Sequence, residues 1–185
     1  MRVGFFGGSF NPPHYSHFLA ASWALCTGEV DEVWMVPCFN HAFGKILAPF
    51  EDRIQMCEIG AAAMGPQIKV SDCEREIQSS YTVDVLDALC LRFPEHKFRL
   101  MVGSDIADET KDWKSFHRIV EIAPPLWVPR GGYHEGNSLE FCLPKISSSA
   151  IRARLEEGLP VDGALPPAVL SFLLEKQLYS HNSAP

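Results

Sequence analysis

Two segments of the chain carry residue types that suit the binding of a phosphorylated ligand. The first runs from Gly7 to His17 and consists of GGSFNPPHYSH. Glycines let backbone N–H groups approach phosphate oxygens, and prolines stiffen the loop. His14 and His17 stand three residues apart at a predicted helix start, so both imidazoles can face one anion at the positive helix end. The pattern predicts a phosphate-binding loop, and a plain strand-to-helix turn with two incidental histidines is the alternative.

The second segment, ISSSAIR, spans residues 146–152. Serines directly before a helix typically cap its N-terminus. Arg152 follows Ser149 by one helical turn and can reach an anion held at the same N-terminus. The segment is therefore either an ordinary capped helix start or a second phosphate cradle.

Alternating apolar strands and amphipathic helices must position these segments. The order predicts a single α/β domain over residues 1–185, with a Rossmann-like parallel sheet and helices on both faces. Ligands bind beyond the carboxyl ends of the strands in such sheets, so residues 7–17, 103–113 and the approach to 148 should form one site. Strands are expected at 3–6, 33–36, 68–70, 98–102 and 126–128, with a possible one at 139–143, and helices at 16–27, 50–64, 81–93, 113–122, 148–157 and 166–178.

Composition and charge exclude several classes of protein. Hydrophobic residues make up 46% of the 185, and 16 Lys+Arg against 23 Asp+Glu give a net charge of -7. This excludes a disordered chain and makes a general nucleic-acid or anionic-membrane binder a poor fit. Residues 3–28 lack charged side chains, but glycines, prolines and histidines interrupt them, so neither a signal peptide nor a membrane span is predicted.

The six cysteines form no CxxC pair, so we expect buried, reduced thiols in a cytoplasmic protein. No metal site is predicted, because His14-x-x-His17 has no cysteine pair spaced to complete a zinc site. Arg53, on the second predicted helix, is either a solvated surface charge or a functional cation.

The combination of GGSFNPPHxxH and ISSSAIR resembles the HxGH-type nucleotidyltransferases. Within that superfamily the chain resembles the bacterial nicotinate (nicotinamide) mononucleotide adenylyltransferases. HAFGK at 41–45, SYTVDVL at 80–86, GSD at 103–105 and WK at 113–114 match in the same order. The resemblance runs from residue 3 to residue 155. It implies transfer of the adenylyl group of ATP to the phosphate of nicotinate mononucleotide, with release of pyrophosphate, in NAD biosynthesis.

The resemblance also implies a role for each matching position. His14, His17 and Arg152 would stabilise the transition state, with Mg²⁺ bridging phosphates and few protein ligands to it. The indole of Trp113 would stack on the cationic pyridinium ring, unless Trp113 is only a packing residue. Small molecules are the expected partners, and a homo-oligomer is possible. The ATP-binding residues would be Gly8, Ser9, Phe10, His14, His17, Asp105, Ser148, Ser149 and Arg152, and the acceptor-binding residues Lys45, Thr82, Trp113 and Arg130.

The chain departs from the family pattern at Ser16, where the first motif normally has glycine, and at Val85, where SYTxDTL has threonine. Two alternative functions therefore stay open. One is a related nucleotidyltransferase with phosphopantetheine or an alcohol phosphate as acceptor. The other is a nucleotide-binding protein weakened by Ser16. Trp113 and the Tyr81-Thr82 pair favour a pyridine acceptor.

Overall fold

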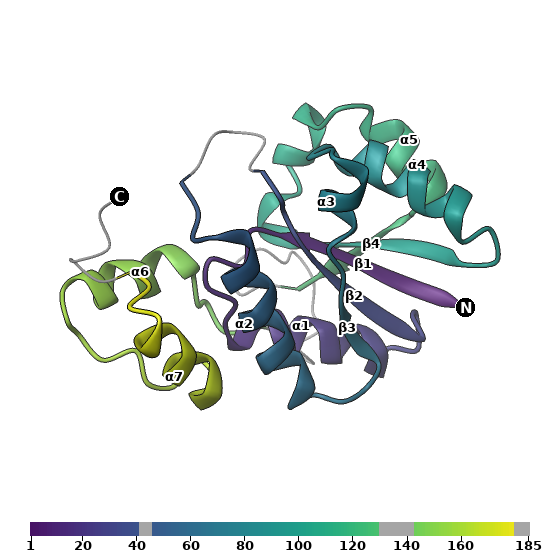
Figure 1. The fold of residues 1–185 in the computed structure, drawn as a ribbon. Coiled ribbons are helices and arrows are strands. Elements are labelled where there is room, and N and C mark those ends of the chain that lie inside the picture. Colours follow the sequence, from purple (N-terminus) through teal and green to yellow (C-terminus); the bar gives the residue numbers. More distant parts are fainter. Residues whose placement is uncertain (41–45, 130–142, 180–185) are drawn as a thin grey trace.

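The computed structural model describes residues 1–40, 46–129 and 143–179 (Figure 1). Its centre is a five-stranded parallel sheet with the order β3-β2-β1-β4-β5. The order reverses between β1 and β4, which is where ligands bind in sheets of this type. The predicted α/β fold with a parallel sheet is confirmed. The strands are β1 (Arg2–Gly8), β2 (Glu32–Pro37), β3 (Ile68–Val70), β4 (Lys97–Gly103) and β5 (Pro125–Val128).

Helices cover both faces of the sheet, as predicted (Figure 1). On one face lie α1 (Tyr15–Cys26) and α2 (Phe50–Ala62). On the other lie α3 (Cys73–Ile77), α4 (Thr82–Arg92) and α5 (Phe116–Ile122). The last two helices, α6 (Ser148–Glu156) and α7 (Pro167–Glu175), pack against α2 and share a third apolar core with it.

Burial on both faces explains why the strands are apolar without alternation. Consecutive β4 residues belong to opposite cores: Leu100 packs with Phe5 beneath α4 and α5, and Met101 packs with Val33 beneath α1 and α2.

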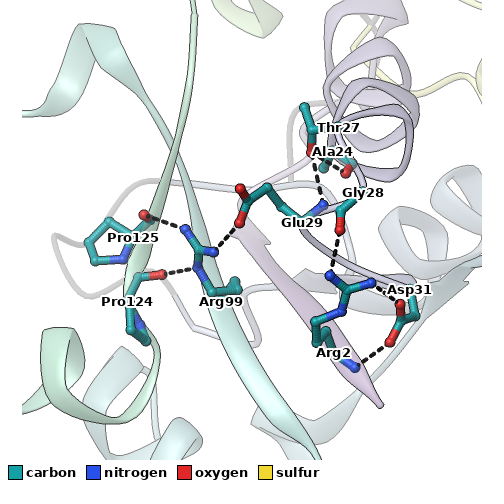
Figure 2. A network of polar contacts seen from close by, with 9 residues as sticks. All are labelled: Arg2, Ala24, Thr27, Gly28, Glu29, Asp31, Arg99, Pro124 and Pro125. Carbon is teal, nitrogen blue, oxygen red and sulfur yellow. Dashed lines mark hydrogen bonds and ion pairs between the residues drawn. The ribbon is translucent and has the colours of Figure 1, made fainter.

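At the amino-terminal end of the sheet, a polar network fastens the turn before β2 to three strands (Figure 2). Arg2 donates to Asp31 at 2.5 Å, and this guanidinium lowers the pKa of Asp31 to about 2. Arg99 on β4 lies 2.5 Å from Glu29 and donates to the carbonyl oxygens of Pro124 and Pro125 at the start of β5. This end of the sheet is therefore tied together by side chains, opposite the carboxyl ends where a ligand is expected.

Several local expectations need correction. The helix predicted over 113–122 begins only at Phe116, and two short 3-10 helices, Ser104–Ile106 and Glu109–Asp112, precede it. Helix α3 was not predicted, because its five residues are too few to show a helical period. Of the possible strand at 139–143, only Leu143 lies within the described residues. All five cysteines in the described ranges are free. The expectation of buried thiols holds for Cys57 and Cys73, whereas Cys38 and Cys90 are half-buried and Cys26 is exposed.

Within the described ranges, no helix has the length and apolar character needed to cross a bilayer.

Candidate active site

A cavity of about 800 Å³ opens where the strand order reverses, at the carboxyl ends of β1 and β4. The loop after β1, the start of α4 and the segment before α5 form its walls. The site therefore lies where the fold predicts it. Among the residues singled out from the sequence, its lining includes Gly8, Ser9, His14, His17, Thr82, Asp105 and Trp113.

The two histidines stand at the first turn of α1. His14 is the N-cap residue, and its backbone N–H donates to Nδ1 of His17 at 3.1 Å. Because Nδ1 accepts, the proton of a neutral His17 ring resides on Nε2, which is then a donor. The two rings stack with centroids 3.7 Å apart, so one ligand group can meet both.

Phe10 supports this arrangement from behind. Its ring is buried and meets the His17 ring edge-on at 4.9 Å, and the ring of Phe6 packs against both, at 5.5 Å from Phe10 and 6.1 Å from His17. Phe10 is not among the described residues that line the cavity, so the structure gives its ring a supporting place behind His17.

The ISSSAIR segment lies directly against the first loop, as predicted. Ser147 caps α6 by accepting the N–H of Ala150 at 3.2 Å, which confirms that this serine is an N-cap. Ser148 Oγ donates to the carbonyl oxygen of Pro12 at 2.8 Å. The start of α6 therefore supports the loop. Ser148, Ser149 and Arg152 are not among the described residues that line the cavity.

Arg152 makes the second contact between these segments. Its Nη1 donates to the carbonyl oxygen of Asn11 at 2.7 Å, and its Nη2 to Ser149 Oγ at 3.3 Å. One guanidinium thus links the loop to the first turn of α6.

Ser16, the departure from the family pattern, has a structural partner. The side chain is 3% exposed and donates to the carbonyl oxygen of Pro144 at 2.8 Å. The hydroxyl therefore ties the start of α1 to the segment that leads into α6. Ser16 also lines the cavity.

Arg53 is neither a surface charge nor solvated, so that interpretation was wrong. It is 1% exposed and donates to the carbonyl oxygens of Ser9 at 3.0 Å and Ala48 at 2.9 Å. Arg53 lies three and four residues before the buried Met56 and Cys57, so all three share one face of α2. This spacing is the signal in the sequence that would have predicted a buried Arg53.

Sequence reasoning missed two residues that hold the first loop. Asn11 is buried, and its Oδ1 accepts from the N–H of Ala48 at 3.0 Å and from the hydroxyl of Tyr179 at 2.7 Å. Burial raises the pKa of Tyr179, so the phenol stays protonated and remains a donor. No motif signalled this pairing, since 168 residues separate the partners.

Glu74 on α3 was also missed. It lines the cavity, is 6% exposed, and accepts the N–H of Phe39 at 2.9 Å. Burial raises the pKa of this carboxyl to about 7, and the nearby charge of Arg53 opposes the rise. The side chain fixes the backbone that follows β2.

The remaining wall holds the residues expected to bind an acceptor. Thr82 is the first residue of α4, and Trp113 precedes α5 with its ring centroid 6.2 Å from that of Phe116. Trp113 both packs on the core and lines the cavity, so its two interpretations are compatible. Lys45 and Arg130 lie outside the described residues.

Comparisons with known proteins agree with this geometry. Residues 5–154 match the family described as cytidylyltransferase-like. A probable nicotinate-nucleotide adenylyltransferase of Anaeromyxobacter sp. (strain K) is 43% identical over 182 residues, covering 96% of each chain. One from Myxococcus xanthus (strain DK1622) is 38% identical over 186 residues, covering 100% of this chain and 98% of its own.

Among solved structures, the nicotinic acid mononucleotide adenylyltransferase of Plasmodium falciparum complexed with NaAD superimposes with a TM-score of 0.81 at 23% identity. The superposition covers 96% of this chain and 97% of the other. At that identity the likeness concerns the fold.

Proposed function

Because this chain belongs to the nicotinate-nucleotide adenylyltransferase family of cytidylyltransferase-like proteins, we propose that it transfers the adenylyl group of ATP to nicotinate mononucleotide in NAD biosynthesis. The products would be the dinucleotide and pyrophosphate. One observation carries the proposal: a single cavity brings the His14–His17 loop together with Thr82 and Trp113. The proposed phosphate site and the proposed aromatic site would thus share one space.

The proposed reaction needs no covalent intermediate on the protein. An oxygen of the mononucleotide phosphate attacks the α-phosphorus of ATP, the new P–O bond forms, and the bond to the pyrophosphate oxygen breaks. Catalysis then consists of alignment and of stabilising charge on the phosphoryl oxygens. Nε2–H of His17, the ring of His14 and the N-terminus of α1 supply donors and positive potential at one place.

The roles of the other site residues are part of the same proposal. The backbone of Gly8, Ser9 and Phe10 would line the phosphate path, and Asp105 would accept from a ribose hydroxyl. Ser148, Ser149 and Arg152 would hold the triphosphate from the α6 side. The contact of Arg152 with the loop at Asn11 supports this, since it brings the guanidinium to the phosphate loop. Lys45 and Arg130 would add positive charge on the acceptor side.

Mg²⁺ is part of the proposal as a companion of ATP. The described ranges contain no group of three or more His, Cys, Asp or Glu side chains arranged to hold a metal. Mg²⁺ that is carried mainly by phosphate oxygens needs few protein ligands. When bound, Mg²⁺ would neutralise phosphate charge. A cytoplasmic location is also proposed, and the free thiols of the described cysteines support it.

The direct test supplies ATP and Mg²⁺ with each candidate acceptor and measures pyrophosphate and the dinucleotide. Product with nicotinate mononucleotide is the expected result, and the amide mononucleotide gives the acid-versus-amide preference. Product only with phosphopantetheine or an alcohol phosphate would contradict the proposal. ATP binding without any product would identify a nucleotide-binding protein instead.

A further inference from the structure

Two ion pairs join α4 to the segment that contains α5. The inner pair is Asp84–Lys114, in which Lys114 Nζ lies 3.0 Å from both carboxylate oxygens. The outer pair is Asp87–Arg118, with 2.9 Å between Asp87 Oδ1 and Arg118 Nη2. Side-chain exposures are nearly equal, 47% and 38% for Lys114 and Asp84 against 46% and 43% for Arg118 and Asp87. The two pairs are therefore alike in exposure. They differ in where they stand and in their further partners, since Arg118 also lies 3.3 Å from Glu121.

The inner pair stands beside the cavity. Lys114 lines it together with its neighbour Trp113, and on the other wall Ser80, Tyr81 and Thr82 line it just before and at the start of α4. The ammonium of Lys114 also lies 4.5 Å from the centroid of the Tyr81 ring. Neither Asp87 nor Arg118 is among the described lining residues.

Asp84 connects Lys114 to the backbone of the opposite wall. Ser79 Oγ donates to Asp84 Oδ2 at 2.9 Å and accepts the N–H of Tyr81 at 3.2 Å. A continuous chain of contacts thus runs from Lys114 through Asp84 and Ser79 to Tyr81. It links the two segments that carry Trp113 and Thr82.

Regular secondary structure does not hold Trp113 in place. It follows the 3-10 helix Glu109–Asp112 and precedes Ser115, whose φ of 51° is in the left-handed region. The backbone N–H of Trp113 donates to the carbonyl oxygen of Thr110 at 3.2 Å, and its ring packs against Phe116, so contacts of individual groups hold the segment. The spacing of two walls that receive a flat ring matters, because stacking contacts weaken within a fraction of an ångström.

We propose that Asp84 and Lys114 are positioning residues, which fix the spacing of the Thr82 and Trp113 walls and thereby set the affinity for the pyridine mononucleotide. The inference rests on the proposed function and adds to it a specific device for acceptor recognition. Asp84 is not among the described residues that line the cavity, whereas Lys114 is, so the proposed role of Lys114 through Asp84 needs a test that separates it from direct binding.

The test compares Asp84→Asn, Lys114→Met and their double variant with the same set at the outer pair, Asp87→Asn, Arg118→Met and their double. KM for nicotinate mononucleotide and KM for ATP are measured for each. Each inner variant should raise the acceptor KM about threefold to fivefold and leave the KM for ATP within twofold. Fivefold corresponds to about 1 kcal/mol, the upper end for an exposed ion pair.

Coupling between the two side chains is the decisive readout. The double inner variant should be no worse than either single variant, because one interaction is lost in all three. Lys114→Arg should keep the acceptor KM close to that of the unchanged chain, since arginine retains the positive charge and can still contact Asp84. The outer variants should leave the acceptor KM unchanged, and thermal denaturation of each variant measures its loss of stability separately.

Three results would overturn the inference. If Asp84→Asn leaves the acceptor KM unchanged while Lys114→Met raises it, Lys114 binds the acceptor directly. If inner and outer variants change the acceptor KM equally, the pairs only stabilise the fold. If the unchanged chain yields no dinucleotide from nicotinate mononucleotide, the proposed function fails and this inference with it. The first two results leave the proposed function standing.

Discussion

Replacing Glu74 by glutamine tests whether its burial costs stability at neutral pH. The pKa of this carboxyl rises from the ordinary 4.5 to about 7 because burial disfavours the charged form. That difference corresponds to about 3 kcal/mol, at about 1.4 kcal/mol per pH unit. The folded state holds the proton of Glu74 more tightly than the unfolded state does. Protonated Glu74 therefore contributes its full share to the free energy of unfolding below about pH 4.5, and this contribution is lost as the pH rises through about 7.

Glutamine keeps an oxygen that can accept the N–H of Phe39, and it cannot ionise. The free energy of unfolding of Glu74→Gln, relative to the unchanged chain, should therefore increase by up to about 3 kcal/mol between about pH 4.5 and about pH 8. Urea denaturation followed by circular dichroism at several pH values measures this difference. Glu58→Gln makes the same chemical change at an exposed position of α2 and serves as the matched control for the loss of a carboxylate.

A difference between Glu74→Gln and the unchanged chain that stays constant over this pH range would refute the reasoning. A difference that decreases as the pH rises would also refute it. It would mean that Arg53 stabilises the charged carboxylate by more than burial disfavours it.

Three further changes have expected outcomes. His17→Ala should lower turnover by about 10²–10³ in pyrophosphate release, with an unchanged circular dichroism spectrum, and a loss below about threefold would remove His17 from the catalytic residues. Ser16→Gly should lower the free energy of unfolding by about 1 kcal/mol, because the bond to the Pro144 carbonyl is lost, while activity is preserved or raised; a collapse of activity would give the hydroxyl a role in the reaction. Gly60→Ala should cost about 1–3 kcal/mol in urea denaturation, because its Cβ would lie 2.0 Å from Cζ of the buried Phe18; an unchanged midpoint would contradict the close packing of α1 on α2.

The fold was predictable because its strands are apolar on both faces and its longer helices show a clear period. The short, mostly apolar segments Val33 to Val36 and Phe98 to Val102 are typical of strands buried in a parallel sheet. Helix α3 and the segment before α5 were not predictable. Five residues give no period, and the left-handed φ of Ser115 depends on tertiary context that the sequence does not display.

The position of the site was predictable from topology, and its internal contacts were not. The sequence indicated that residues 7–17 and 146–152 lie together, and Ser148 and Arg152 do contact the loop. It did not indicate that Arg53 is buried beneath that loop, that Tyr179 reaches Asn11, or that Glu74 enters the cavity wall. These contacts join elements far apart along the chain, and each residue alone has an ordinary surface interpretation.

The buried donors around the first loop suit the anion site that we propose there, in a chain with a net charge of -7. The peptide units at Asn11-Pro12 and Pro12-Pro13 have a carbonyl oxygen and no N–H, so they would repel a phosphate. Arg152 and Ser148 bind these two oxygens, and Arg53 binds that of Ser9. Donors from α2 and α6 thus offset the partial negative charges of the loop. The positive potential at the start of α1 would then act on a ligand with less opposition from these three carbonyl oxygens.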